Sequence, residues 1–262
     1  MLTFVGLGLY DDRSITLQGR DALREADRVF AERYTSRLVG ASFADVEAAH
    51  DIEIEIRPRA GVEQDPEPIL DAAEDGDAVF CTAGDTMIST THVDLRLRAH
   101  ERGIDTRIVH GTTAAAAASS LTGLQNYRFG KATTLPFETS HGGEGVPQSV
   151  IETIEANRER GLHTLVFLDI KVGDDREEYM TGAAAAELLA TDWEEDALGV
   201  IVARAGSPDP VVTAEALDTL ADIDFGDPLH MLVIPGELHY IERDALVELA
   251  GAPESAADSL LV

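Results

Sequence analysis

Short apolar runs alternate with longer amphipathic stretches along the first half of the chain. Four runs predict strands, at residues 3–5, 53–56, 78–81 and 107–109. Three stretches between them predict helices, at residues 16–34, 66–73 and 90–102. Within the first of these, the compact apolar run 28–31 leaves a short strand as an alternative to continuous helix. Strands that alternate with helices are typical of α/β architecture.

The second half of the chain has a sparser pattern. Three apolar runs predict strands, at residues 164–168, 199–203 and 231–234, and residues 183–190 predict a helix. Residues 112–120 are mostly small, so they either begin a well-packed helix or connect two domains. The stretch 138–146 is predicted to be a mobile loop. We therefore predict two α/β domains, residues 1–112 and 113–262.

Acidic residues outnumber basic ones by 49 to 20, which gives a net charge of -29. Only Lys131 and Lys171 are lysines, and the charges are spread along the chain rather than clustered. This pattern favours solubility in concentrated salt, where a Debye length of about 3 Å screens the repulsion, over steering of a basic partner. It predicts a halophilic protein that loses structure at low salt. It argues against generic binding to nucleic acid or anionic membranes, which needs clustered lysine and arginine.

Other features of the sequence predict a cytoplasmic location. No apolar run approaches the roughly 18–20 residues that span a bilayer, and the first residues lack the basic region of a secretory signal. Cys81 is the only cysteine and lies in a predicted strand, so we expect it to be a buried, unpaired side chain.

Glycine and polar residues follow three of the predicted strands. These segments are Gly6-Leu7-Gly8, Gly84-Asp85 and Gly111-Thr112-Thr113. Glycine lets a ligand approach the main chain, so we expect a ligand crevice at the carboxyl edge of one sheet. Asp85 either caps the next helix or binds a ribose hydroxyl pair or a ligand amine. Thr112 and Thr113 suit either a cap or a hydrogen bond to a ligand.

Some classes of site fit the sequence poorly. Asp11 stands where the dinucleotide fingerprint needs its third glycine, which counts against a nucleotide-binding oxidoreductase. No spacing of histidine, cysteine and acidic residues resembles a zinc site, and no metal is predicted. A non-catalytic binding module remains open as a further class.

Longer motifs extend nearly from end to end and carry a family resemblance. They are residues 4–9 with Asp11-Asp12, Gly84-Asp85 with Thr90-Thr91-His92, His110-Gly111, residues 121–131, residues 162–171, residues 203–207 and Pro228-Leu229-His230. With these motifs the chain resembles the diphthine synthase family, which belongs to the class III, tetrapyrrole methylase-like, S-adenosylmethionine-dependent methyltransferases. The nearest alternative is a class III enzyme that methylates a tetrapyrrole precursor of the precorrin or sirohaem pathway.

The resemblance implies a fold, a reaction and partners. Such enzymes have two α/β domains with the cofactor cleft between them, and they form homodimers. They transfer methyl groups from S-adenosyl-L-methionine, which leaves S-adenosyl-L-homocysteine. The acceptor is the amino group of 3-carboxy-3-aminopropyl-histidine in translation elongation factor 2, and the product is diphthine.

The resemblance also implies cofactor contacts at eight positions of this chain: Leu9, Asp85, Ile88, Thr113, Ala114, Leu168, Ala205 and His230. Two positions depart from the family pattern. Thr86 stands where proline is usual, and Thr113-Ala114 stands where serine and a larger aliphatic residue are common. The catalytic base is not identified by the sequence. Asp11, Asp12, His92 and His110 are candidates by location only.

Overall fold

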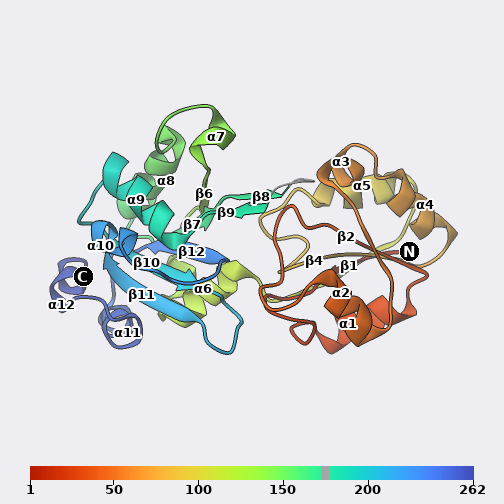
Figure 1. The fold of residues 1–262 in the computed structure, drawn as a ribbon, viewed down its shortest axis with the longest axis horizontal. Helices are drawn as coiled ribbons and strands as arrows, with labels where there is room; N and C mark the ends of the chain where they lie inside the picture. The colour runs from red at the N-terminus through yellow and green to blue at the C-terminus, as the bar shows by residue number, and fades with distance from the viewer. Residues whose placement is uncertain (173–176) are drawn as a thin grey trace. The chain divides into compact units, whose positions relative to one another are not determined.

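The chain forms two compact units in a computed structural model that describes residues 1–172 and 177–262 (Figure 1). The first unit is built from Met1–Thr113 together with Val172, and the second from Ala114–Lys171 and Glu177–Val262. Each unit has its own sheet and its own apolar core. The α/β fold class predicted from the sequence is confirmed.

The first unit contains a fully parallel sheet of five strands in the order β3-β2-β4-β1-β5. The strands are β1 (Leu2–Gly6), β2 (Arg28–Ala31), β3 (Ile54–Ile56), β4 (Ala78–Thr82) and β5 (Thr106–Val109). All four predicted strands are present. The prediction of one helix across residues 16–34 is wrong, because its second part forms β2, the alternative left open by the compact run 28–31.

Five helices cover the two faces of this sheet. They are α1 (Leu17–Glu25), α2 (Phe43–His50), α3 (Arg59–Glu63), α4 (Glu67–Asp75) and α5 (Val93–Glu101). Figure 1 shows α1 and α2 on one side and α3, α4 and α5 on the other. Side chains alternate between the faces, so Phe4 and Phe80 pack toward α4 and α5 while Val5 and Cys81 pack toward α1 and α2. Cys81 is buried and unpaired, as predicted.

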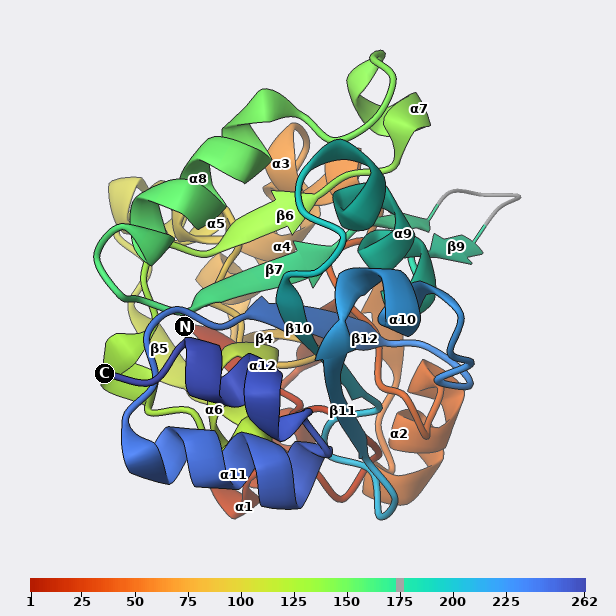
Figure 2. The same ribbon diagram turned by 90° about the vertical axis from the view of Figure 1, so that its left-hand side faces the viewer.

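The second unit contains a mixed sheet in the order β11-β10-β12-β7-β6, whose strands Figure 2 shows next to one another. Its strands are β6 (Thr133–Leu135), β7 (Thr164–Leu168), β10 (Leu198–Ala203), β11 (Val211–Ala216) and β12 (His230–Ile234). β12 runs antiparallel to both β7 and β10, and β6 runs parallel to β7. A separate two-stranded sheet pairs β8 (Ile170–Val172) with β9 (Glu177–Tyr179).

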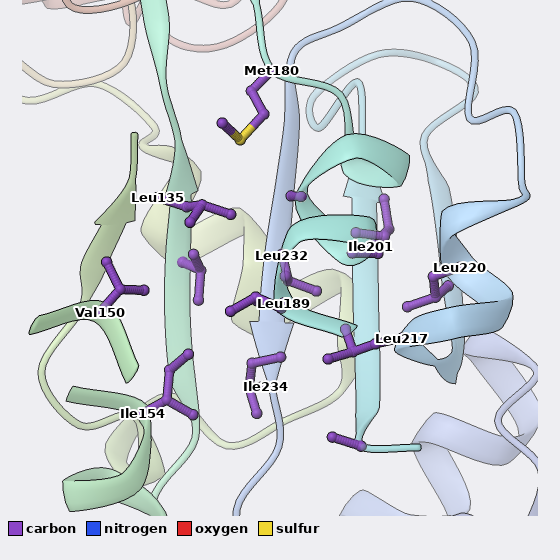
Figure 3. Packing of buried hydrophobic residues seen from close by; sticks show 14 of the residues in the cluster. Leu135, Val150, Ile154, Met180, Leu189, Ile201, Leu217, Leu220, Leu232 and Ile234 are labelled. Carbon is purple, nitrogen blue, oxygen red and sulfur yellow. The ribbon is translucent and has the colours of Figure 1, made fainter. Parts of the chain in front are cut away.

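Helices also cover both faces of the second sheet. They are α6 (Ala114–Thr122), α7 (Glu138–His141), α8 (Gln148–Arg158), α9 (Gly182–Asp192), α10 (Leu217–Ala221), α11 (Tyr240–Ala250) and α12 (Glu254–Ser259), with a short 3₁₀ helix at Asn126–Arg128. The main core lies between the sheet and α8, α9 and α10, where Ile154, Leu189 and Leu217 pack against Ile201 and Leu232 (Figure 3). The predicted loop 138–146 is partly wrong, because α7 occupies its first residues.

Candidate functional site

Three glycines bring the ends of β1, β4 and β5 together at the carboxyl edge of the first sheet. A Cβ added to Gly6 would lie 2.5 Å from Gly111 N and 2.6 Å from Gly84 O, and one added to Gly111 would collide with Gly84 O. Gly84 N also donates to Gly8 O at 2.7 Å, which ties the first two turns to each other. A Cβ on Gly84, in contrast, would meet no atom within 4 Å. Open space therefore lies beside the main chain that leads into Asp85.

Asp85 joins the end of β4 to the end of β5 through a side chain that is only 3% exposed. Its Oδ1 accepts from Met87 N at 2.9 Å, and its Oδ2 accepts from His110 Nδ1 at 2.8 Å and from Gly111 N at 3.2 Å. The next helix begins only at Val93, so the capping interpretation is wrong. A carboxylate offers about four acceptor positions, and three of them are used by these donors. One acceptor position therefore remains beyond these three hydrogen bonds.

His92 lies behind this edge rather than on it. The ring is 2% exposed and packs edge-on against Phe80, with 5.0 Å between the ring centroids. Its Nδ1 lies 3.1 Å from Thr86 O, to which it donates, and its Nε2 lies 3.5 Å from the Tyr34 hydroxyl. Burial lowers the pKa of His92 below its ordinary value. Burial therefore favours the neutral ring, which supports the turn at Thr86.

The side chains of Asp11 and His110 differ in their solvent exposure and in their hydrogen bonds. Asp11 Oδ1 accepts from Arg13 N and from Ser14 Oγ, at 3.0 Å and 3.1 Å, within the turn after β1. The His110 side chain is 74% exposed and is held at its Nδ1 by Asp85. Of these two side chains, His110 is the one that presents an open polar group at the edge.

The second unit has a comparable edge, where β7 and β10 end and β12 begins. Ala203 pairs with His230, and Phe167 pairs with Met231, so His230 lies between the ends of its two neighbouring strands. Leu168 is half-buried at the end of β7, and Ala205 is buried two residues beyond β10. These side chains form a mainly apolar edge.

The His230 ring is buried, and both of its nitrogens form hydrogen bonds within the protein. Its Nδ1 accepts from Gly182 N at 2.9 Å, and its Nε2 donates to Asp227 O at 3.1 Å. The residue is 5% exposed, and burial lowers the pKa of His230 below its ordinary value. Both ring nitrogens are therefore already used and do not hydrogen-bond a ligand.

The eight predicted cofactor contacts fall into two groups, one in each unit. Leu9, Asp85, Ile88 and Thr113 follow β1, β4 and β5 of the first unit, while Leu168, Ala205 and His230 share the edge of the second; Ala114 begins α6. Sequence reasoning missed the close packing of Gly6, Gly84 and Gly111 and the pairing of Asp85 with His110. Both depend on neighbours in space, and only the glycines after each strand gave a signal.

Comparison with known proteins adds a family to this geometry. The family model of tetrapyrrole (corrin/porphyrin) methylases matches residues 1–221. Diphthine synthase of Halorubrum lacusprofundi is 73% identical over 260 residues, which cover 97% of this chain and 98% of that protein. The chain belongs to the diphthine synthase family of tetrapyrrole methylases. Diphthine synthase of Halobacterium salinarum is 71% identical over 98% of this chain and all of that protein.

Solved structures place this diphthine synthase family member on the same fold. A crystal structure of diphthine synthase matches with a TM-score of 0.89 and 38% identity, over 98% of each chain. The two haloarchaeal relatives agree with the halophilic character predicted from the net charge. Within the part of the chain that the structure describes, no group of three or more histidine, cysteine or acidic residues is arranged to hold a metal ion. No helix among these residues is long and apolar enough to cross a membrane.

Proposed function

We propose that this protein transfers methyl groups from S-adenosyl-L-methionine to the amino group of 3-carboxy-3-aminopropyl-histidine in translation elongation factor 2, forming diphthine. The observation that supports this most strongly is the 73% identity to a diphthine synthase over almost the full length of both chains. The tetrapyrrole alternative is not favoured, because the curated relatives that match this chain at 65–73% identity are named diphthine synthases.

Asp85 and the carboxyl edge of the first sheet, where Gly84 lies, fit the cofactor that we propose. S-Adenosyl-L-methionine carries ribose hydroxyls and an ammonium group, and a buried carboxylate with an acceptor position left can bind either of them. The open space at Gly84 gives a ligand access to the main chain next to Asp85. In the first unit, the apolar side chains of Leu9 and Ile88 suit the adenine ring and the thioether of the product S-adenosyl-L-homocysteine.

Positioning is the main task of these residues in the proposed reaction. When bound, the cofactor supplies an electrophilic methyl carbon, so no metal is needed. In the first unit, Asp85 and the main chain near Thr113 hold the ligand in one orientation, which lowers the entropic part of the barrier. The acceptor amine must also lose its proton before it can attack.

The partners that we propose are elongation factor 2 and a second copy of this chain, in the cytoplasm. Tyr240, Ile241 and Leu249 on α11 are exposed apolar side chains, and Leu261 and Val262 add to them at the end of the chain. Exposed apolar residues of this kind suit burial in a homodimer. Sedimentation of the protein and of Leu249→Asp in molar salt tests this, and a wild-type monomer would contradict it.

Radiolabelled methyl transfer in molar salt tests the proposed substrate class. The protein is incubated with methyl-labelled S-adenosyl-L-methionine and either elongation factor 2 carrying the aminocarboxypropyl-histidine or a reduced tetrapyrrole precursor. We expect label only in the protein substrate. Label in the tetrapyrrole alone would assign the chain to the other class III reaction, and cofactor binding with label in neither would contradict both.

A further inference from the structure

His110 is held by Asp85 in a way that fixes its role at the edge of the first sheet. An ionised carboxylate can only accept hydrogen bonds, so the 2.8 Å contact between Asp85 Oδ2 and His110 Nδ1 places the imidazole proton on Nδ1. The tautomer follows from this partner. In the neutral ring, Nε2 is then left with its lone pair. Since the side chain is 74% exposed, that lone pair is accessible from outside the unit.

We propose that His110 is the general base that removes the proton from the acceptor ammonium, and that Asp85 orients it. This inference rests on the proposed function. Among the other candidates after these strands, His92 is buried with both ring nitrogens hydrogen-bonded. Asp11 and Asp12 carry carboxylates, which are weaker bases than an imidazole. His110 combines an accessible basic nitrogen with a neighbour that fixes its orientation, which is the arrangement that general bases need.

The proton and electron balance of the step is simple. The Nε2 lone pair of His110 takes one proton from the substrate ammonium, which becomes a neutral amine, and the imidazole becomes an imidazolium stabilised by the Asp85 carboxylate. The amine lone pair then forms a bond to the methyl carbon. The carbon–sulfur bond breaks with its electron pair going to sulfur, so the positive charge moves from sulfur to the methylated nitrogen. His110 returns its proton to water before the next transfer.

The close packing around Asp85 makes this pair rigid. The same Oδ2 accepts from Gly111 N, the residue directly after His110, while Oδ1 accepts from Met87 N. The carboxylate is therefore fixed by main-chain donors on both oxygens, and the imidazole is the only exposed partner among these three. A base held in this way keeps its accessible nitrogen in one direction.

Two substitutions of His110 distinguish a general base from a residue that only positions Asp85. His110→Asn places an amide N–H close to where Nδ1 lies, so it keeps a donor to Asp85 but has no basic nitrogen. His110→Ala removes both. We expect kcat for methylation of elongation factor 2 near neutral pH to fall by about 100-fold or more in both variants, the scale of general base catalysis. In alkaline buffer, where the amine loses its proton to water, kcat of both should recover relative to wild type.

Two further readouts do not depend on turnover. Binding of S-adenosyl-L-methionine by calorimetry should be unchanged in His110→Asn. Nitrogen NMR of the wild type should show one exposed histidine with Nδ1 protonated and Nε2 bare, whose signals disappear in that variant. If His110→Asn kept the wild-type kcat at neutral pH and only His110→Ala had a lower kcat, the general base proposal would be refuted. His110 would then serve only to position Asp85. A wild type without methyl transfer to elongation factor 2 would instead refute the proposed function.

Discussion

Replacing Asp85 with alanine should lower the free energy of unfolding of the first unit by about 2 kcal/mol. The substitution removes the acceptor of Met87 N, at 2.9 Å, and of Gly111 N, at 3.2 Å. Each main-chain N–H that loses its partner at a half-buried position costs about 1 kcal/mol. The exposed His110 ring regains a hydrogen bond from water, so it adds little to the loss.

Hydrogen exchange measured by mass spectrometry in molar salt would follow this change locally. Peptides that cover β4 and β5 should exchange faster in Asp85→Ala, because the carboxylate joins the ends of these two strands. Asp105→Ala is the matched control, since it removes one exposed carboxylate just before β5 and changes the net charge equally. The control should exchange like the wild type.

The same variant should lose affinity for S-adenosyl-L-methionine, by about 1.5–3 kcal/mol if the carboxylate accepts a charge-assisted hydrogen bond from it. Calorimetry on folded protein in molar salt measures that affinity. Unchanged affinity together with faster exchange would show that Asp85 has only a structural role. Unchanged exchange would refute the claim that its hydrogen bonds hold the ends of β4 and β5 together.

Three other predictions follow from the structure. Gly111→Ala should lower the free energy of unfolding by about 2–3 kcal/mol, because its Cβ would collide with Gly84 O. The control Gly103→Ala should lower it by only about 1 kcal/mol, because its Cβ meets nothing and only the positive φ is unfavourable. Equal urea midpoints for the two variants would contradict this. Burial lowers the pKa values of His92, His163 and His230, so the unfolded chain binds more protons than the folded one. The free energy of unfolding should therefore fall as the pH drops below about 6.5. A urea midpoint that rises on acidification would refute this. With a net charge of -29, the protein should lose its circular dichroism signal in dilute buffer, where the Debye length grows to about 30 Å at 0.01 M salt; full structure there would disprove salt dependence.

The strands of the first unit could be predicted because each is a continuous apolar run between turn signals. Residues 78–81 form such a run, and the structure buries β4 completely between two layers of helices. Residues 28–31 were ambiguous because the helix-like spacing of the preceding residues continues into them. The tertiary pairing of β2 with β4, which local sequence does not encode, decides in favour of the strand.

Several elements of the second unit could not be predicted. β11 is half-buried at the edge of the sheet, so its apolar signal is weak. β6 and the strands β8 and β9 are three residues long, too short for any period to be recognised. The antiparallel direction of β12 is a property of connections rather than of its own residues.

The site was predictable only in part for the same reason. Glycines after each strand indicate close approach, and the packing of Gly6 and Gly111 against Gly84 confirms that approach. The contact of Asp85 with His110 joins residues 25 positions apart and depends on the order of the strands in the sheet. Location alone could not separate the exposed His110 from the buried His92.

The most direct test of the proposed function is mass analysis of the modified histidine. Elongation factor 2 that carries the aminocarboxypropyl-histidine would be treated in molar salt with this protein and trideuteromethyl S-adenosyl-L-methionine. The histidine peptide should gain mass in trideuteromethyl steps, with fragment ions that place each gain on the side-chain amine. An unmodified peptide, under conditions where the protein binds the cofactor, would contradict diphthine formation as the function of this chain.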